Sequence, residues 1–190
     1  YRQMGSMLQG HPDKNKVPGV DMSSGSLGQG ISAAVGIALN AKIDGSGYRV
    51  YAVLGDGELE EGQVWESAMF AARYKLGNLT AVVDNNGLQI DEKVEEVMSG
   101  YPITDRFKSF GWTVFEVDGH DFAGLEKVFG DCRKTGDAPQ VVVAHTVKGR
   151  GVSFMENSLE WHGSPPNAEQ YARAMGELDA LQTALEANGI

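Results

Sequence analysis

The sequence has 190 residues, of which 42% are hydrophobic and 8% aromatic, enough for one ordinary globular domain with its own core. Its formal net charge is −10 and its Lys and Arg residues are scattered singly, so we expect neither a nucleic-acid surface nor a membrane surface. One cysteine, Cys132, cannot form an internal disulfide, and no signal-peptide pattern opens the chain. These features predict a reducing, cytoplasmic location.

Apolar runs rich in β-branched residues alternate with helical patterns along the chain. Helices are predicted within residues 25–44, 62–77, 122–136 and 168–187, and strands within 48–55, 78–84, 112–119 and 140–147. The first helix has Ile31, Val35 and Leu39 at helical spacing, and Gly77 is the expected left-handed residue after the second. The alternation predicts an α/β fold with a doubly wound, mostly parallel sheet flanked by helices, as a single domain over residues 1–190.

Polar turns follow the first two predicted strands, where open parallel sheets bind ligands. Asp56 lies in "GDG" after one strand, and Asn86 lies in "DNNG" after the other. If the strands are neighbours, both side chains reach the same edge of the sheet. With the carbonyl of Leu88 they form an all-oxygen set suited to Mg²⁺ or Ca²⁺ shared with a phosphate. Gly55 and Gly57 would let a diphosphate approach the backbone closely.

These turns also have a simpler interpretation. Asp-Gly and Asn-Gly are common turn formers, and an isolated "GDG" is more often a turn than a metal site. The combination is more specific. A "GDG", then a helix and a strand, then "NN", is the two-part signature of thiamine diphosphate enzymes, and it stands here in the strand–helix–strand context that the signature requires.

Three colinear blocks, residues 10–42, 55–91 and 145–163, resemble the diphosphate-binding domain of transketolase. The resemblance covers residues 10 to about 172, and it is closer still to the separately encoded N-terminal subunit found in some prokaryotes. It implies the thiamine diphosphate-binding fold, with thiamine diphosphate and Mg²⁺ or Ca²⁺ as cofactors. The implied activity is transfer of a two-carbon ketol unit from a ketose phosphate to an aldose phosphate, as in the pentose phosphate pathway.

The resemblance also implies roles for individual residues. Asp56, Asn86 and the Leu88 carbonyl would coordinate the metal. Contacts with the coenzyme are expected of Gly25, Leu27, Gly55, Gly57, Glu61, Asn86 and His162, with Glu61 at the subunit junction. His11 in "GHP" and His162 in "WHG" would be the catalytic histidines.

Two of the four histidines are therefore functional candidates. His11 and His162 both lie in predicted loops, and a histidine can exchange protons with sugar hydroxyls and carbonyls near neutral pH. From the residues alone, surface histidines without a role are the plainer alternative, and only the resemblance favours function. We expect His145 to be a core or strand-end residue and His120 to be a turn and cap residue.

Other features receive structural interpretations. Glu58 and Glu60 are expected to favour a helix N-terminus through its dipole. The last helix carries an apolar stripe, expected to form core or a subunit contact, made of Tyr171, Met175, Leu178 and Leu181.

The family's pyrimidine-binding and C-terminal domains have no counterpart in these residues, and neither has its catalytic glutamate. The opening "YRQMGSML" lacks an initiator Met, so an upstream segment is also expected to be absent. We therefore expect a C-terminal transketolase subunit to supply the pyrimidine-binding half of the site. Self-association into a hetero-oligomer and sugar phosphates as substrates are the other expected interactions.

Three alternatives stay open at this point. Another thiamine diphosphate enzyme, such as a 2-oxo acid dehydrogenase subunit or deoxyxylulose phosphate synthase, would share the fold, although the "SSGSLGQG" and "WHG" blocks favour transketolase. A nicotinamide-binding module would need a different glycine spacing from "GSLGQG" and a strand before it. A non-catalytic fragment that only assembles with a partner is the third.

Overall fold

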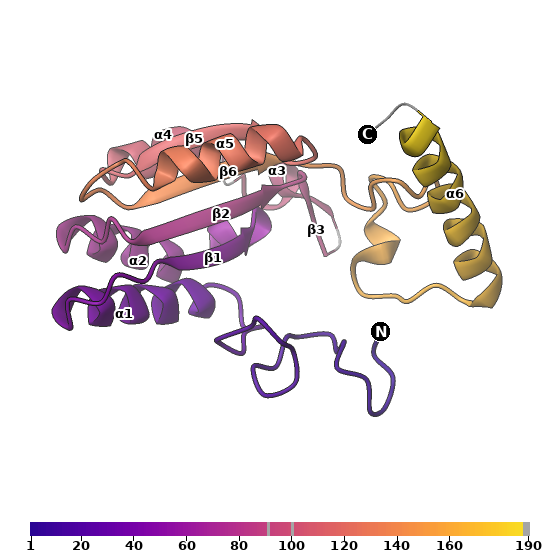
Figure 1. Ribbon diagram of the computed structural model, residues 1–190, viewed down its shortest axis with the longest axis horizontal. Coiled ribbons are helices and arrows are strands. Elements are labelled where there is room, and N and C mark those ends of the chain that lie inside the picture. Colours follow the sequence, from indigo (N-terminus) through magenta and orange to yellow (C-terminus); the bar gives the residue numbers. More distant parts are fainter. Residues whose placement is uncertain (91, 100, 188–190) are drawn as a thin grey trace.

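Figure 1 shows the chain as a computed structural model, which describes residues 1–90, 92–99 and 101–187. Asp91, at the end of the second block that resembles transketolase, and the last three residues of the predicted domain lie outside the described residues. Residues 1–28 form an irregular N-terminal segment, and the α/β core follows. No helix in the described part is long and apolar enough to cross a lipid bilayer.

All four predicted strands and all four predicted helices are present, with shifted ends. The helices are α1 (Gln29–Ile43), α2 (Gly62–Arg73), α3 (Val94–Val97), α4 (Ile103–Ser109), α5 (Phe122–Cys132) and α6 (Ala168–Ala187), with 3₁₀ helices η1 (Gly57–Glu60) and η2 (Leu159–His162). The strands are β1 (Val50–Gly55), β2 (Leu79–Asn85), β3 (Leu88–Gln89), β4 (Glu92–Lys93), β5 (Thr113–Asp118) and β6 (Gln140–His145). The sequence interpretation did not include the β3–β4 hairpin, α3 or α4.

The main sheet has the strand order β1-β2-β6-β5, and every neighbouring pair is parallel. Gly55 at the end of β1 is opposite Asp84 of β2, so the two predicted polar turns leave the sheet side by side. Likewise, Asn85 at the end of β2 is opposite His145 at the end of β6. The predicted parallel α/β fold is confirmed.

Helices cover both faces of this sheet. On one face, Leu54, Val83 and Val143 belong to a continuous core with residues of α1, α2 and α4. On the other face, Val128 and Cys132 of α5 form a smaller core with Val142. In Figure 1, α1 runs along the β1 side and α5 lies over the β5 side of the sheet. This arrangement is the doubly wound architecture expected from the alternating pattern.

The second helix ends earlier than predicted. Arg73 is the last residue of α2, and Lys75 takes the left-handed conformation with φ 52°. The amide of Leu76 donates to the carbonyl of Ala71 and that of Lys75 to Ala72, which is the hydrogen-bond pattern of a Schellman motif. Because this ending buries Leu76 fully, Lys75 and not Gly77 is the left-handed residue. Gly77 instead allows close packing, since a Cβ there would collide with the carbonyl oxygen of Gly136.

The C-terminal helix α6 stands apart from the sheet and packs against the loop that precedes it (Figure 1). Its apolar stripe is not part of the core, and the other expected role, a subunit contact, stays a prediction. The exposed fractions are 58% for Tyr171, 38% for Met175, 38% for Leu178 and 48% for Leu181. Ala174 is the buried residue of this helix.

Candidate functional site

Asp56 joins the two polar turns at the carboxyl edge of the sheet. Its Oδ1 accepts the amide of Gly57 at 2.9 Å, and its Oδ2 accepts the amide of Gly87 at 2.5 Å. Its own amide donates to the carbonyl of Asp84 at 3.3 Å, which extends the pairing of β1 with β2 past the strand end. The Asp56 residue is 1% exposed. The structure thus brings the "GDG" and "DNNG" turns together, as the sequence predicted.

The electrostatic environment of Asp56 is unfavourable for an isolated negative charge. Burial raises the pKa of Asp56, the two backbone N–H donors lower it by less, and the nearby charge of Asp84 raises it further. A buried carboxylate of this kind is stabilised when a cation comes into contact with it. Its surroundings therefore fit the metal-ligand role predicted for it.

Asn86 and Leu88 lie in the turn that Asp56 holds. The Oδ1 atom of Asn86 accepts the amide of Leu88 at 3.0 Å, and both residues are partly buried. An amide oxygen has a second lone pair, so this hydrogen bond leaves Asn86 able to bind a cation. In the described part of the chain, no group of three or more His, Cys, Asp or Glu side chains could hold a metal. The only predicted metal site is the mixed oxygen set of one carboxylate, one amide and one carbonyl.

Glu58 has a role that the sequence interpretation did not identify. Its Oε1 accepts the amide of Gly28 at 2.7 Å and its Oε2 accepts the amide of Gly55 at 3.2 Å. Glu58 therefore ties the start of α1 to the end of β1, and it also lies in the first turn of η1, where the expected dipole effect stays a prediction. Glu60 lies in the same turn, and both its carboxylate oxygens accept the side-chain amide of Gln89, at 3.2 and 3.3 Å.

Tyr101 supports the end of strand β2, next to the "DNNG" turn. Its hydroxyl donates to Oδ1 of Asn85 at 2.7 Å. Burial, followed by the charges of Asp56 and Glu95, raises the pKa of Tyr101 to about 12, so the phenol keeps its proton at neutral pH. Tyr101 lies in a segment where the sequence pattern predicted no element, and no motif pointed to it.

The two histidines expected to be structural lie at the same edge of the sheet. His145 is a strand-end residue, as expected, with Nδ1 3.1 Å from Nδ2 of Asn85 and Nε2 3.1 Å from Oε2 of Glu116. His120 lies in a turn, as expected, and its Nε2 accepts the amide of Val147. The helix cap is the neighbouring Asp121, whose carboxylate accepts the amide at the start of α5, so the cap assignment to His120 is wrong.

Three of the predicted coenzyme residues, Gly25, Leu27 and Glu61, lie around the start of α1. Gly25 has φ 149°, and a Cβ there would lie 2.6 Å from Cγ of His11. The "SSGS" loop therefore packs directly against the imidazole of the "GHP" loop. Leu27 is 50% exposed. Glu61 is the exposed N-cap residue of α2, and its Cβ would be 3.1 Å from a Cβ on Gly28.

Gly55 and Gly57 differ in their surroundings. A Cβ on Gly55 would meet nothing within 4 Å, so the space beside the end of β1 is open. A Cβ on Gly57 would lie 2.8 Å from Cβ of Gln89, so Gly57 lets the β3–β4 hairpin approach the "GDG" turn.

The two candidate catalytic histidines lie on exposed loops. His162 is the last residue of η2, which lies against strand β3 and so close to the "DNNG" turn. Lys148 places its Nζ 3.5 Å from Nδ1 of His162. His11 is exposed on its outer side and rests against Gly25.

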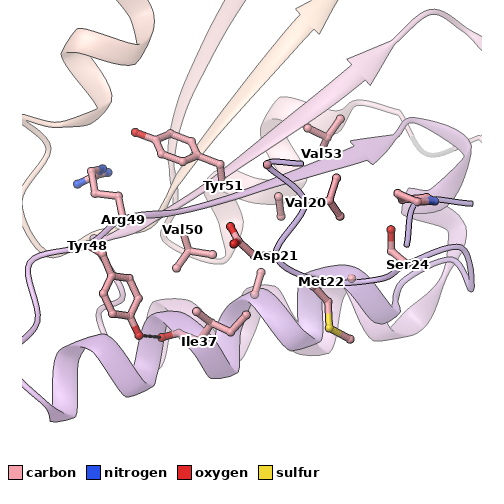
Figure 2. A pocket seen from close by; sticks show the side chains of 15 residues that line it. Val20, Asp21, Met22, Ser24, Ile37, Tyr48, Arg49, Val50, Tyr51 and Val53 are labelled. Carbon is pink, nitrogen blue, oxygen red and sulfur yellow. Dashed lines mark hydrogen bonds between the residues drawn. The ribbon is translucent and has the colours of Figure 1, made fainter. Parts of the chain in front are cut away.

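A separate hollow lies away from the two polar turns. A groove of about 780 Å³ runs along β1, between the N-terminal segment and α1 (Figure 2). Figure 2 shows Met22 and Ile37 on one side of this groove and Tyr51 on the other. Neither Asp56 nor Asn86 lines it. We therefore place the candidate site at the turns, on the basis of their chemistry, and not in the groove.

Comparisons with known proteins all match this chain to part of a transketolase. The family model "Transketolase, thiamine diphosphate binding domain" matches residues 1–180. A subunit of the apulose-4-phosphate transketolase of Phocaeicola vulgatus is 42% identical over 184 residues, covering 97% of this chain and 65% of that protein. Human transketolase is 44% identical over 167 residues, covering 86% of this chain and 26% of the human protein. The crystal structure of Campylobacter jejuni transketolase matches with a TM-score of 0.84 and 29% identity, covering 93% of this chain and 29% of that one.

Proposed function

The chain belongs to the transketolase family, in which it corresponds to the thiamine diphosphate-binding domain, and from this premise we propose that it binds thiamine diphosphate with Mg²⁺ or Ca²⁺ for ketol transfer between sugar phosphates. The family predicted from the three sequence blocks is confirmed. The chain spans 65% of the Phocaeicola vulgatus protein and 26% of human transketolase. We therefore propose the activity of a complete transketolase for this chain only together with further protein domains.

The observation that supports the proposal is the buried carboxylate of Asp56 between the two turns. In the proposed complex, Asp56, the Asn86 amide oxygen and the Leu88 carbonyl would hold the cation, whose charge would offset that of the diphosphate. Gly55 leaves open space at the end of β1, where the diphosphate would lie, and Gly57 would contact it from the adjoining turn. This arrangement explains how a chain of net charge −10 can bind an anionic coenzyme without a cluster of basic side chains.

The bound cofactor supplies the carbon chemistry that accepts and releases the two-carbon unit. The role proposed for this chain's histidines is to handle protons. His11 and His162 would hold and transfer protons at the hydroxyl and carbonyl oxygens of the sugar, with His162 also touching the coenzyme. Gly25 and Leu27 would line the ring side of the coenzyme, and Glu61 would lie at the subunit junction.

The proposed substrates are a ketose phosphate as donor and an aldose phosphate as acceptor, with pentose phosphates as the default. The name of the Phocaeicola vulgatus relative adds apulose 4-phosphate to the substrates to be tried.

The proposal includes a partner chain. The same relative is named as one subunit of a transketolase, which suggests a second subunit for this chain as well. We propose that a C-terminal transketolase subunit supplies the pyrimidine-binding half of the site. The resulting hetero-oligomer would contain more than one copy of this chain and would lie in the cytoplasm. A non-catalytic fragment that only assembles is the remaining alternative.

Calorimetric titration of thiamine diphosphate into the chain with Mg²⁺, and again with EDTA, tests the cofactor half of the proposal. Asp56→Ala is the test variant and Asp105→Ala, whose side chain is 71% exposed on α4, is the matched control. We expect metal-dependent binding that Asp56→Ala abolishes and Asp105→Ala leaves unchanged.

A titration with NAD⁺ tests the rival ligand. Binding of NAD⁺ in place of thiamine diphosphate, or binding of the coenzyme that ignores both EDTA and Asp56→Ala, would contradict the proposed site.

A further inference from the structure

The guanidinium of Arg2 lies between the two loops that carry His11 and His162. Its Nη1 donates to the carbonyl of Gly163 at 2.8 Å. A Cβ built on Gly10 would lie 2.9 Å from Nε and 2.9 Å from Nη2 of the same side chain. Gly10 directly precedes His11, and Gly163 directly follows His162. One side chain therefore contacts the backbone neighbours of both candidate catalytic residues, which are far apart in the sequence.

A backbone turn at residues 2–8 brings the side chain of Arg2 close to Gly10. Arg2 takes the left-handed conformation with φ 56°, which is unfavourable for a residue with a side chain. Its amide donates to the carbonyl of Leu8 at 2.8 Å, so residues 2–8 form a closed turn. The turn returns the chain to Gly10, beneath the guanidinium. Figure 1 shows this N-terminal segment beside the loop that carries η2.

The contacts extend from Arg2 to the coenzyme side of the site. The His11 ring packs against Gly25, which lacks the Cβ that would collide with it. On the other side, η2 with His162 packs against strand β3. Each loop thus has a support of its own, and Arg2 contacts both loops.

Arginine suits this position for a physical reason. Its planar guanidinium has five N–H donors in a fixed geometry, so it can pack flat against one glycine and donate to the carbonyl of another. A lysine ammonium could reach the Gly163 carbonyl but would not fill the same space. A side chain at position 10 would displace the guanidinium, so glycine there is part of the arrangement.

We propose that Arg2 is a positioning residue that fixes His11 relative to His162, so that both can face the same sugar phosphate. This inference rests on the proposed function for the roles of the two histidines. In this role Arg2 acts through the backbone at Gly10 and Gly163. The competing explanation is that Arg2 only orders the N-terminal segment.

The histidine content of the chain allows a direct test. There are four histidines, so a ¹H–¹³C NMR spectrum of the full chain labelled at the histidine Cε1 atoms has four ring signals to assign. His11 and His162 report on the link, while His120 and His145, at the carboxyl ends of other strands, are internal controls. Three variants change the link: Arg2→Ala, Arg2→Lys and Gly10→Ala. Arg133→Ala, an exposed arginine at the end of α5, is the matched control.

For Arg2→Ala and Gly10→Ala, we expect the His11 and His162 signals to shift together by more than a line width, with His120 and His145 unmoved. Arg2→Lys should return the His162 signal part of the way, and Arg133→Ala should move none of the four. A shift of His11 alone, or of neither histidine, overturns the proposal and favours ordering of the N-terminal segment. A shift of all four signals also overturns it, because it shows a general change of fold.

The same samples separate this inference from the proposed function. The thiamine diphosphate titration tests the cofactor site, and the NMR comparison needs neither cofactor nor partner. If both histidines respond to Arg2→Ala while wild-type chain binds no thiamine diphosphate, the link is real and the proposed function fails. If the coenzyme binds and the two signals do not move together, the function stands and the link is wrong.

Discussion

The Asp56 turn and the two histidine loops would serve neighbouring parts of one site, yet they are held in different ways. Asp56 is 1% exposed and is fixed by backbone amides of both turns, so its position follows from the pairing of β1 with β2. His11 and His162 are exposed and lie on loops without strand or α-helix, joined through the side chain of Arg2.

This difference between the buried turn and the exposed loops indicates which part of the site depends on the fold. The sheet cannot form without bringing Asp56 to Gly87, whereas the distance between the histidines depends on a few side-chain contacts at the surface. We therefore expect changes at the turn to affect cofactor binding and stability together. Changes on the loops should affect catalysis and leave the fold intact.

The largest expected effect comes from the histidines. In His11→Ala, ketol transfer with the partner subunit should fall by about 10²–10⁴-fold, the usual contribution of a general acid or base, because the proton-transfer group is lost. Thiamine diphosphate affinity of the chain should stay close to wild type. The measurements are a coupled transfer assay and calorimetry, with His120→Gln as control since glutamine can still accept the Val147 amide. A parallel loss of coenzyme affinity in His11→Ala would remove the contrast between the two regions.

The next effect concerns Asn86. In Asn86→Ala, thiamine diphosphate affinity in the presence of Mg²⁺ should fall by about 100-fold, because one oxygen ligand of a hard cation is lost. With EDTA the variant and wild type should bind equally weakly. Calorimetry with and without metal measures both, and Asn40→Ala on the exposed side of α1 is the control. Equal affinities with Mg²⁺ would exclude Asn86 as a ligand.

A smaller effect is expected at Glu58, which connects the turn to α1. Glu58→Gln keeps one acceptor oxygen and loses the charge that strengthens two backbone hydrogen bonds. The free energy of unfolding in urea should fall by about 1–2 kcal/mol. Glu126→Gln, exposed on α5, should change it little. If Glu58→Gln is as stable as wild type, the link between α1 and β1 is not energetically significant.

The smallest effect is a pH dependence from Asp56. Its raised pKa means that, just above the ordinary value of 3.8, the folded chain keeps a proton that the unfolded chain has lost. The contribution of Asp56 to stability is therefore present at low pH and is lost as the pH rises through the folded-state pKa. The unfolding free energy of wild type minus that of Asp56→Asn should decrease from about pH 4 upwards in cofactor-free protein. An increase over this range would show that the pKa is lowered and not raised.

The sequence pattern predicted the elements that place the turns, because their signals are local. The strands that end at Gly55 and Asn85 are continuous apolar runs followed by polar turns, and both are confirmed. The helix end at Gly77 was wrong because burial of Leu76 decided where the helix stops. For the α6 stripe the spacing left core and subunit contact both open, because spacing shows which side chains share a face, and not what that face packs against.

The supporting residues of the site had no such signal. Glu58, Tyr101 and Arg2 have partners that are distant in sequence, at Gly28, Asn85 and Gly163. Each interaction exists only after the loops and strands have been brought together. A glutamate after "GDG" or a tyrosine in an unassigned segment looks the same in the sequence whether or not it has such a partner.

By itself the sequence determined the α/β class, the family and the residue types at the two turns, because apolar periodicity and short motifs are local properties of the chain. Only the tertiary structure decided that Asp56 is buried with a raised pKa, that Glu58 ties a helix to a strand, and that Arg2 spans the two histidine loops. Burial, charge proximity and long-range hydrogen bonds depend on distances that the chain acquires when it folds.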